Sequence, residues 1–203
     1  MTPMRRRPRL IVGSLGSITL LIMTTAMLML FPAVTRSQTP GLVGGAFALI
    51  DQDGAEVTER DLLGRPSVIF FGFTSCPDLC PSTLLDITNW LTQLGPDADR
   101  LNVVFVSVDS EHDTPARIKL YLSSFDPRIR GFVGSETQIQ KITNAYGVRY
   151  KRLARNDGEY TYTHSVLIYL MDRQGRYVGF LRYEEPDTEA VATLHRLAAG
   201  DNE

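Results

Sequence analysis

Residues 67–81 read SVIFFGFTSCPDLCP, and this stretch indicates the fold most clearly. Its first seven residues are nearly all apolar and do not alternate with polar ones, which is typical of a β-strand buried on both faces. Beyond the second cysteine, the apolar residues 84, 87, 91 and 94 recur at helical spacing until Gly95-Pro96 ends the helix. The stretch therefore predicts a buried strand that leads into a helix, with both cysteines at the junction.

The remaining sequence supplies the other elements of an α/β domain. Further strands are predicted at residues 46–50, 101–108, 148–153, 160–162, 166–171 and 177–183, helices at 114–125, 136–146 and 187–199, and a helical turn at 59–63. The order is strand, helix, strand, helix, then an antiparallel hairpin and a closing helix. This order predicts a mixed sheet flanked by helices, as in a thioredoxin-like fold with an inserted segment.

Composition narrows the class of protein. A chain of 203 residues fits one domain, and two cysteines are too few for a disulfide scaffold. The net charge of −2 argues against a nucleic-acid partner. Residues 1–36 contain five arginines and no acidic residue, so residues 37–203 carry a net charge of −7. This acidic part is not expected to bind anionic lipid or nucleic acid.

The N-terminal segment is predicted to lie outside the globular fold. Residues 10–35 contain no charged side chain and would span about 39 Å as a helix, against about 30 Å for a bilayer core. The arginines before this segment predict a single-pass anchor in the inner membrane with the C-terminal domain in the periplasm. A cleaved signal peptide and a buried core helix are the alternatives. The expected organisation is a cytoplasmic basic head (1–9), an anchor (10–35), a tether (36–45) and the domain (46–203).

The two cysteines, Cys76 and Cys80, are the candidate chemical groups. Positions i and i+4 share one face of a helix, and a helix N-terminus favours the thiolate form. Three uses of the pair remain open: a structural disulfide, a redox-active dithiol, or a site for a soft metal such as Cu(I) or Zn(II). A bridge over three residues closes too small a loop to stabilise much, and a metal would need a third ligand.

Three histidines compete for the place of third ligand. His164 precedes the predicted strand 166–171, and in a thioredoxin-like sheet the loop that enters this strand lies beside the dithiol loop. His112 lies in a polar loop at the same end of the sheet, and His195 lies in the last helix, far from the cysteines. Met171 is a conceivable soft ligand, but a methionine in an apolar strand is typical of a core. His164 is the expected ligand.

Three blocks of this sequence resemble the Sco/SenC family. Residues 70–81 (FFGFTSCPDLCP) resemble its signature, and residues 105–109 (FVSVD) followed by 113–115 (DTP) resemble its second block. His164-Ser165, ahead of residues 169–172 (YLMD) and 175–176 (GR), resembles the third. The combination of Cys-x-x-x-Cys with a downstream histidine is specific, and the resemblance covers about residues 44–198.

This resemblance implies a membrane-tethered copper metallochaperone with a thioredoxin-like fold. Its copper ligands would be Cys76, Cys80 and His164, binding Cu(I) and, with help from the imidazole, Cu(II). The implied acceptor is the binuclear copper centre of cytochrome c oxidase subunit II, and an upstream copper donor and a thiol reductant are expected as further partners. Thr163 departs from the family, whose members often have an acidic residue before this histidine.

The alternative function is that of an enzyme. A thiol–disulfide oxidoreductase would use Cys76 and Cys80 as its redox dithiol, acting on the copper-site cysteines of the oxidase or on other exported thiols. The Cys-x-x-x-Cys spacing differs from the Cys-x-x-Cys of general dithiol oxidoreductases. A peroxidase is a weaker alternative, since Thr74 and Pro77 loosely resemble peroxiredoxins.

Overall fold

The structure, a computed structural model, describes residues 43–154 and 160–200. The predicted head (1–9) and anchor (10–35) lie outside these residues. In the described part of the chain, no helix has both the length and the apolar character needed to cross a membrane.

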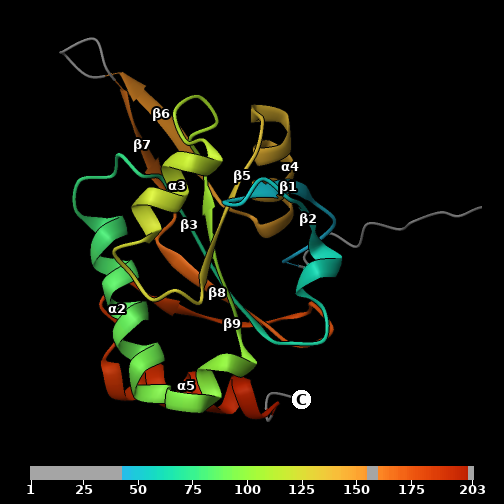
Figure 1. Cartoon of the computed structure of the whole chain (residues 1–203), viewed down its shortest axis with the longest axis vertical. Coiled ribbons are helices and arrows are strands. Elements are labelled where there is room, and N and C mark those ends of the chain that lie inside the picture. Colours follow the sequence, from blue (N-terminus) through green and yellow to red (C-terminus); the bar gives the residue numbers. More distant parts are fainter. Residues whose placement is uncertain (1–42, 155–159, 201–203) are drawn as a thin grey trace, which may run out of the picture. The chain divides into compact units, whose positions relative to one another are not determined.

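A seven-stranded mixed sheet forms the centre of the domain (Figure 1). Strands β3, β4 and β5 run parallel, and the other pairings in this sheet are antiparallel. A separate two-stranded ribbon pairs β6 (Tyr150–Ala154) with β7 (Tyr160–His164). The sheet order is β2 (Glu56–Thr58), β1 (Ala48–Asp51), β5 (Ile129–Val133), β4 (Asn102–Ser107), β3 (Ser67–Gly72), β8 (Leu167–Met171) and β9 (Tyr177–Arg182).

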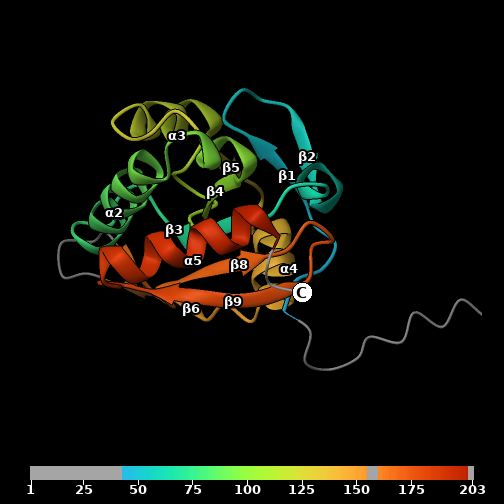
Figure 2. The same ribbon diagram turned by 90° about the horizontal axis from the view of Figure 1, so that it is seen from below.

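Helices cover both faces of this sheet (Figure 2). The long helix α2 packs beside the last helix, α5, and the Trp90 indole donates to the Asp187 carboxylate across this contact at 2.7 Å. On the other face, Tyr146 of α4 packs on the rings of Phe71 and Tyr169. The helices are α2 (Leu79–Leu94), α3 (Pro115–Leu122), α4 (Glu136–Tyr146) and α5 (Asp187–Ala199), with 3₁₀ turns η1 (Glu59–Leu62) and η2 (Gly95–Arg100).

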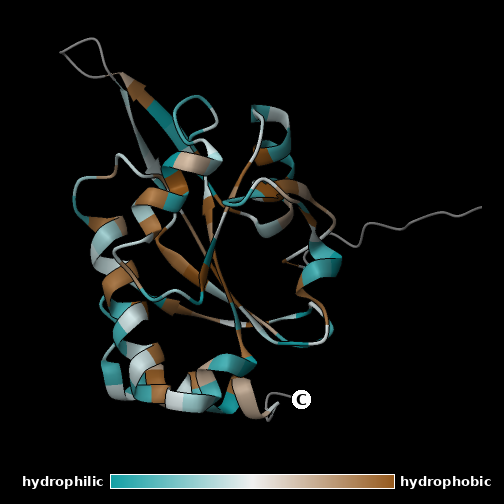
Figure 3. Ribbon diagram, viewed as in Figure 1, coloured by the Kyte–Doolittle hydropathy of each residue, from teal (hydrophilic) through white to brown (hydrophobic). Residues whose placement is uncertain are grey.

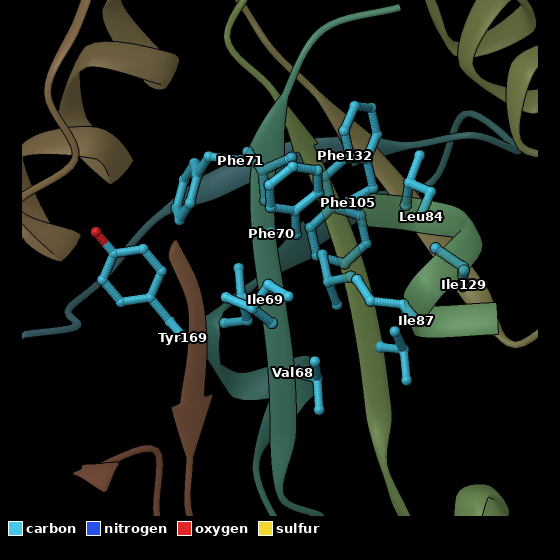
Figure 4. Packing of buried hydrophobic residues seen from close by; sticks show 14 of the residues in the cluster. Val68, Ile69, Phe70, Phe71, Leu84, Ile87, Phe105, Ile129, Phe132 and Tyr169 are labelled. Atoms are coloured by element: carbon cyan, nitrogen blue, oxygen red, sulfur yellow. The ribbon is translucent and has the colours of Figure 1, made fainter. Parts of the chain in front are cut away.

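Strand β3 is buried on both faces, as its unbroken apolar sequence predicts. Figure 4 shows Phe71 on one side of β3 with Tyr169, and Phe70 on the other side with Phe105, toward α2. Figure 3 shows that hydrophobic residues follow these central strands. Each such aromatic side chain contributes roughly 1.5–3 kcal/mol of transfer free energy. The mixed sheet with flanking helices confirms the predicted fold.

Two strands and one helix end were predicted wrongly. The sequence prediction omitted β2, which is only three residues long, and β5, which contains Gly131. Glycine weakens a strand, but here the Ile118 and Leu122 side chains of α3 occupy the space that a Cβ atom at position 131 would need. Helix α3 ends at Leu122 rather than at residue 125. Pro127 follows closely and disfavours a helical conformation at the residue before it.

Candidate metal centre

Cys76 and Cys80 meet at the junction between β3 and α2. Cys80 lies in the first turn of α2, whereas Cys76 lies in the loop before it, so the predicted shared helix face is wrong. Instead, the backbone N–H of Cys80 donates to the Cys76 Sγ at 3.4 Å. Neither cysteine is in a disulfide; Cys80 is fully buried and Cys76 is partly exposed. Pro81 occupies the early helical position predicted for it.

Gly72, at the end of β3, leaves room for the buried sulfur. A Cβ atom at this position would lie 2.8 Å from the Cys80 Sγ and 2.7 Å from the Phe105 ring. Both distances are well below normal contact, so a side chain at position 72 is incompatible with the present position of the Cys80 sulfur.

A buried carboxylate holds the loop that carries Cys76. The Asp113 side chain is fully buried and accepts hydrogen bonds from the Thr74 backbone at 3.0 Å, the Thr74 hydroxyl at 2.5 Å and the Ser107 hydroxyl at 2.5 Å. Arg117 of α3 donates to the hydroxyls of Thr74 at 2.8 Å and Ser75 at 2.9 Å. The loop is therefore tied to β4 and to α3.

His164 reaches the cysteines from a different part of the chain. It is the last residue of β7 (Tyr160–His164), which pairs with β6 (Tyr150–Ala154). Its ring lies against the rings of Phe70 and Phe73, with centroids 6.3 and 5.9 Å away. Its Nδ1 lies 3.0 Å from the Ser165 carbonyl oxygen, and its Nε2 lies 3.5 Å from the Cys80 Sγ. With Nδ1–H donating to that carbonyl, Nε2 presents its lone pair to the sulfurs.

The three side chains form a compact group of metal-binding type. The sulfurs of Cys76 and Cys80 and a ring nitrogen of His164 all lie within 4.8 Å of one another. Metal–ligand bonds of about 2.0–2.3 Å in a trigonal arrangement would separate the ligand atoms by about 3.5–4.0 Å. The group therefore needs to contract by less than about 1 Å to surround one ion, and its S₂N donor set suits a soft metal.

The two thiols differ in their protonation. The hydrogen bond from the Cys80 thiol lowers the pKa of Cys76 to about 4, although partial burial acts in the opposite direction. The same hydrogen bond, together with burial, raises the pKa of the Cys80 thiol. At neutral pH the pair thus consists of a Cys76 thiolate that accepts from a Cys80 thiol. Backbone N–H groups of Asp78 and Cys80, at the start of α2, also lower the pKa of Cys76, as the sequence-based expectation of a helix-terminus effect requires.

Tyr121 of α3 lies within electrostatic range of this pair. Burial raises the pKa of Tyr121, and the negative charge of the cysteines raises it further. Its hydroxyl is buried and has no hydrogen-bond partner within residues 43–154 and 160–200. The Tyr121 hydroxyl is therefore a hydrogen-bond donor near the sulfurs that has no acceptor among the described residues.

The other candidate ligands have structural contacts elsewhere. His112 stacks on Tyr160 and bonds to Asp109, and His195 bonds to Asp97 at 3.2 Å. Met171 is buried in β8, as expected of a core residue.

Sequence reasoning missed the residues that support the centre: Gly72, Asp113, Arg117 and Tyr121. A glycine inside a buried apolar strand is a recognisable sign of close approach by another group. No comparable sign exists for Asp113 or Tyr121, because their burial depends on elements that are far apart in the sequence.

The fold and the site together define a thioredoxin-like protein in which two cysteines and a histidine converge with the spacing of a soft-metal centre. A family model described as SCO1/SenC matches residues 35–199. The chain belongs to the SCO1/SenC family.

Several relatives show the extent of this similarity. A SCO2-like protein of Rickettsia prowazekii is 41% identical over 138 residues, which cover 67% of each chain. The copper-bound structure of Bradyrhizobium japonicum ScoI is 48% identical, with a TM-score of 0.72, over 76% of this chain and 99% of that one. BsSco, described as a member of the Sco family of cytochrome c oxidase assembly proteins, is 20% identical over 79% of this chain and 96% of that one. Its TM-score of 0.63 shows the fold alone. The chain spans only 42% of the length of an Arabidopsis thaliana relative, the mitochondrial SCO1 homolog 1.

Proposed function

We propose that this protein is a copper metallochaperone that delivers copper to the binuclear centre of cytochrome c oxidase subunit II. The observation that carries the proposal is the convergence of Cys76, Cys80 and His164 within 4.8 Å. Thiolates favour Cu(I), and the imidazole also suits Cu(II). The copper bound by a relative of 48% identity, and the family's description as oxidase assembly proteins, support this function.

In this proposal copper is the cargo, and the partial exposure of the site allows the ion to be transferred to a partner. Cys80 is fully buried, whereas Cys76 and His164 are partly exposed, so a partner ligand approaches from their side. Three protein ligands leave room for an incoming thiolate or thioether, and the ion passes from one protein to the other without entering solvent. Loading requires both cysteines to be reduced. An upstream copper donor and a thiol reductant are therefore further proposed partners.

We place this domain in the periplasm, tethered to the inner membrane by residues 10–35. The support comes from the sequence: the uncharged segment is long enough to span the bilayer, and arginines precede it. Carbonate extraction of cell membranes, with detection of the intact N-terminus, tests this placement. Release of the chain by carbonate or loss of residues 1–35 would contradict it.

Anaerobic copper titration of the protein tests the metal site. We expect one Cu(I) per chain, and we expect Cys76→Ser, Cys80→Ser and His164→Ala each to lose stoichiometric binding. His195→Ala is the matched control, because this histidine bonds to Asp97 and lies outside the metal-binding group. Full copper retention by any of the three ligand variants under reducing conditions would overturn the assignment.

The Cys76 thiolate supports a second candidate function, thiol–disulfide oxidoreductase. It would attack a partner disulfide, forming a mixed disulfide and releasing one partner thiolate. Cys80, after losing its proton, would then attack the Cys76 sulfur, forming the Cys76–Cys80 disulfide and releasing the second partner thiol. The dithiol supplies both electrons. Reductase activity that survives His164→Ala but not Cys76→Ser would favour this function.

A further inference from the structure

A hollow with two positive charges lies directly beside His164. Its volume is about 320 Å³, and it is a shallow depression that is open to solvent. It is formed by β6, β7 and the residues next to them in the chain, at the opposite end of the domain from α5 (Figure 1). The lining residues are Arg149, Tyr150, Lys151, Thr163, His164 and Ser165.

Arg149 and Lys151 supply the positive charges of this hollow. Both residues are exposed, and neither side chain has a carboxylate partner among the residues that the structure describes. By contrast, the neighbouring Arg152 pairs with Glu111 at 3.3 Å. Glu136, the carboxylate of the adjoining surface, accepts hydrogen bonds from the hydroxyls of Tyr150 at 2.9 Å and Ser110 at 2.8 Å.

This local charge is opposite to that of the domain as a whole. The described residues 149–154 and 160–164 contain three basic side chains and no acidic one, within a segment (37–203) of net charge −7. Lys151 lies opposite Thr163 in the β6–β7 register, so the position before the ligand histidine contributes no carboxylate to offset it. A partner with a negative surface is therefore attracted to the His164 side of the metal centre.

We propose that this hollow is the docking surface for an acidic segment of the protein that exchanges copper with the centre, an inference that rests on the proposed function. Arg149 can hold a carboxylate through two parallel hydrogen bonds, and Lys151 acts as a point charge beside it. Contact here places the partner next to His164, a partly exposed ligand. The hollow thus orients the partner and accelerates encounter, while the three ligands hold the ion.

The double variant Arg149→Gln/Lys151→Gln tests this docking surface in the full-length chain in a zwitterionic detergent. The matched control, Arg60→Gln/Arg196→Gln, removes two positive charges from exposed residues of η1 and α5, which do not line the hollow. The probe is the soluble copper domain of oxidase subunit II. At about 20 mM salt we expect copper transfer from the docking variant to be about 3–10-fold slower, with the difference vanishing at about 0.5 M salt. We expect both variants to bind one copper ion per chain, as the wild type does.

The outcomes separate this proposal from the proposed function. Equal low-salt transfer by the wild type and the docking variant, with copper still bound, overturns the docking surface and leaves the metallochaperone intact. If the chain holds no copper, the metallochaperone fails. In that case, calorimetric titration of the copper-free chain with the same subunit II domain tests docking. The docking surface requires that Arg149→Gln/Lys151→Gln bind this domain more weakly than the wild type and the control variant do. Loss of binding to anionic lipid vesicles without any change in transfer would assign the hollow to the membrane and overturn the proposal.

Discussion

Replacing Gly72 by alanine probes the link between the packing of the core and the metal centre. The added Cβ would lie 2.8 Å from the Cys80 Sγ and 2.7 Å from the Phe105 Cε2 atom. Normal contacts between such atoms are about 3.5–4.0 Å, so both neighbours must retreat by roughly 1 Å. The sulfur is only one bond from its own Cβ, so it moves only if the side chain rotates or the start of α2 shifts.

Gly72→Ala is expected to change both the free energy of unfolding and the copper affinity. Overpacking of this kind lowers the free energy of unfolding by about 1–3 kcal/mol. Metal sites tolerate deviations of about 0.2 Å in ligand distances, and the Cys80 Sγ already lies 3.5 Å from the His164 Nε2. A shift of roughly 1 Å exceeds that tolerance, so we expect a loss of copper affinity of about 10–100-fold, the range seen when groups that orient metal ligands are changed.

Competition with a Cu(I) chelator and urea unfolding of the copper-free protein measure the two effects. Gly134→Ala is the control, because its Cβ would also overpack a core, at 2.6 Å from the Leu49 side chain of β1 rather than against a ligand or α3. We expect Gly134→Ala to lose stability while it keeps copper affinity. Wild-type copper affinity in Gly72→Ala, with stability reduced, would show that the position of the sulfur does not depend on this glycine.

Three further predictions concern charge and protonation. Asp113→Asn weakens the buried bonds that hold the Cys76 loop and is expected to lower the free energy of unfolding by about 2–4 kcal/mol in urea denaturation; an unchanged midpoint would refute this. The hydrogen bond from Arg128 lowers the pKa of Asp126, so its stabilisation is present above about pH 4 and is lost as the pH falls through the lower folded pKa. The difference in stability between the wild type and Asp126→Asn, about 1–3 kcal/mol at pH 7, should shrink toward zero in acid, as followed by urea unfolding at several pH values. Cu(I) binding at pH 7–8 should release one proton per ion, measurable by calorimetry in buffers of different ionisation enthalpy, because Cys76 is already a thiolate and Cys80 is not; release of two protons would contradict this.

Much of the fold could be predicted because its central elements have strong local patterns. The apolar run of β3 and the helical spacing of α2 are visible in the sequence because both elements face the core along their length. Strand β5 was missed because Gly131 is there to admit the side chains of α3, and that contact is not encoded locally. The cysteine pair and His164 were identified by residue type and by their positions relative to strands.

The sequence by itself determined most of the order of the elements, the two cysteines at the junction of β3 and α2, and the histidine at the end of β7. These features follow from chain periodicity and residue chemistry. Only the tertiary structure decided that Cys76 lies before the helix, that Ser165 orients the imidazole and that Asp113 anchors the loop. It also decided that Arg149 and Lys151 lie beside His164 without carboxylate partners in the described part of the chain. The physical reason is that such contacts join residues distant in sequence, and only the packing of sheet and helices sets the distances between them.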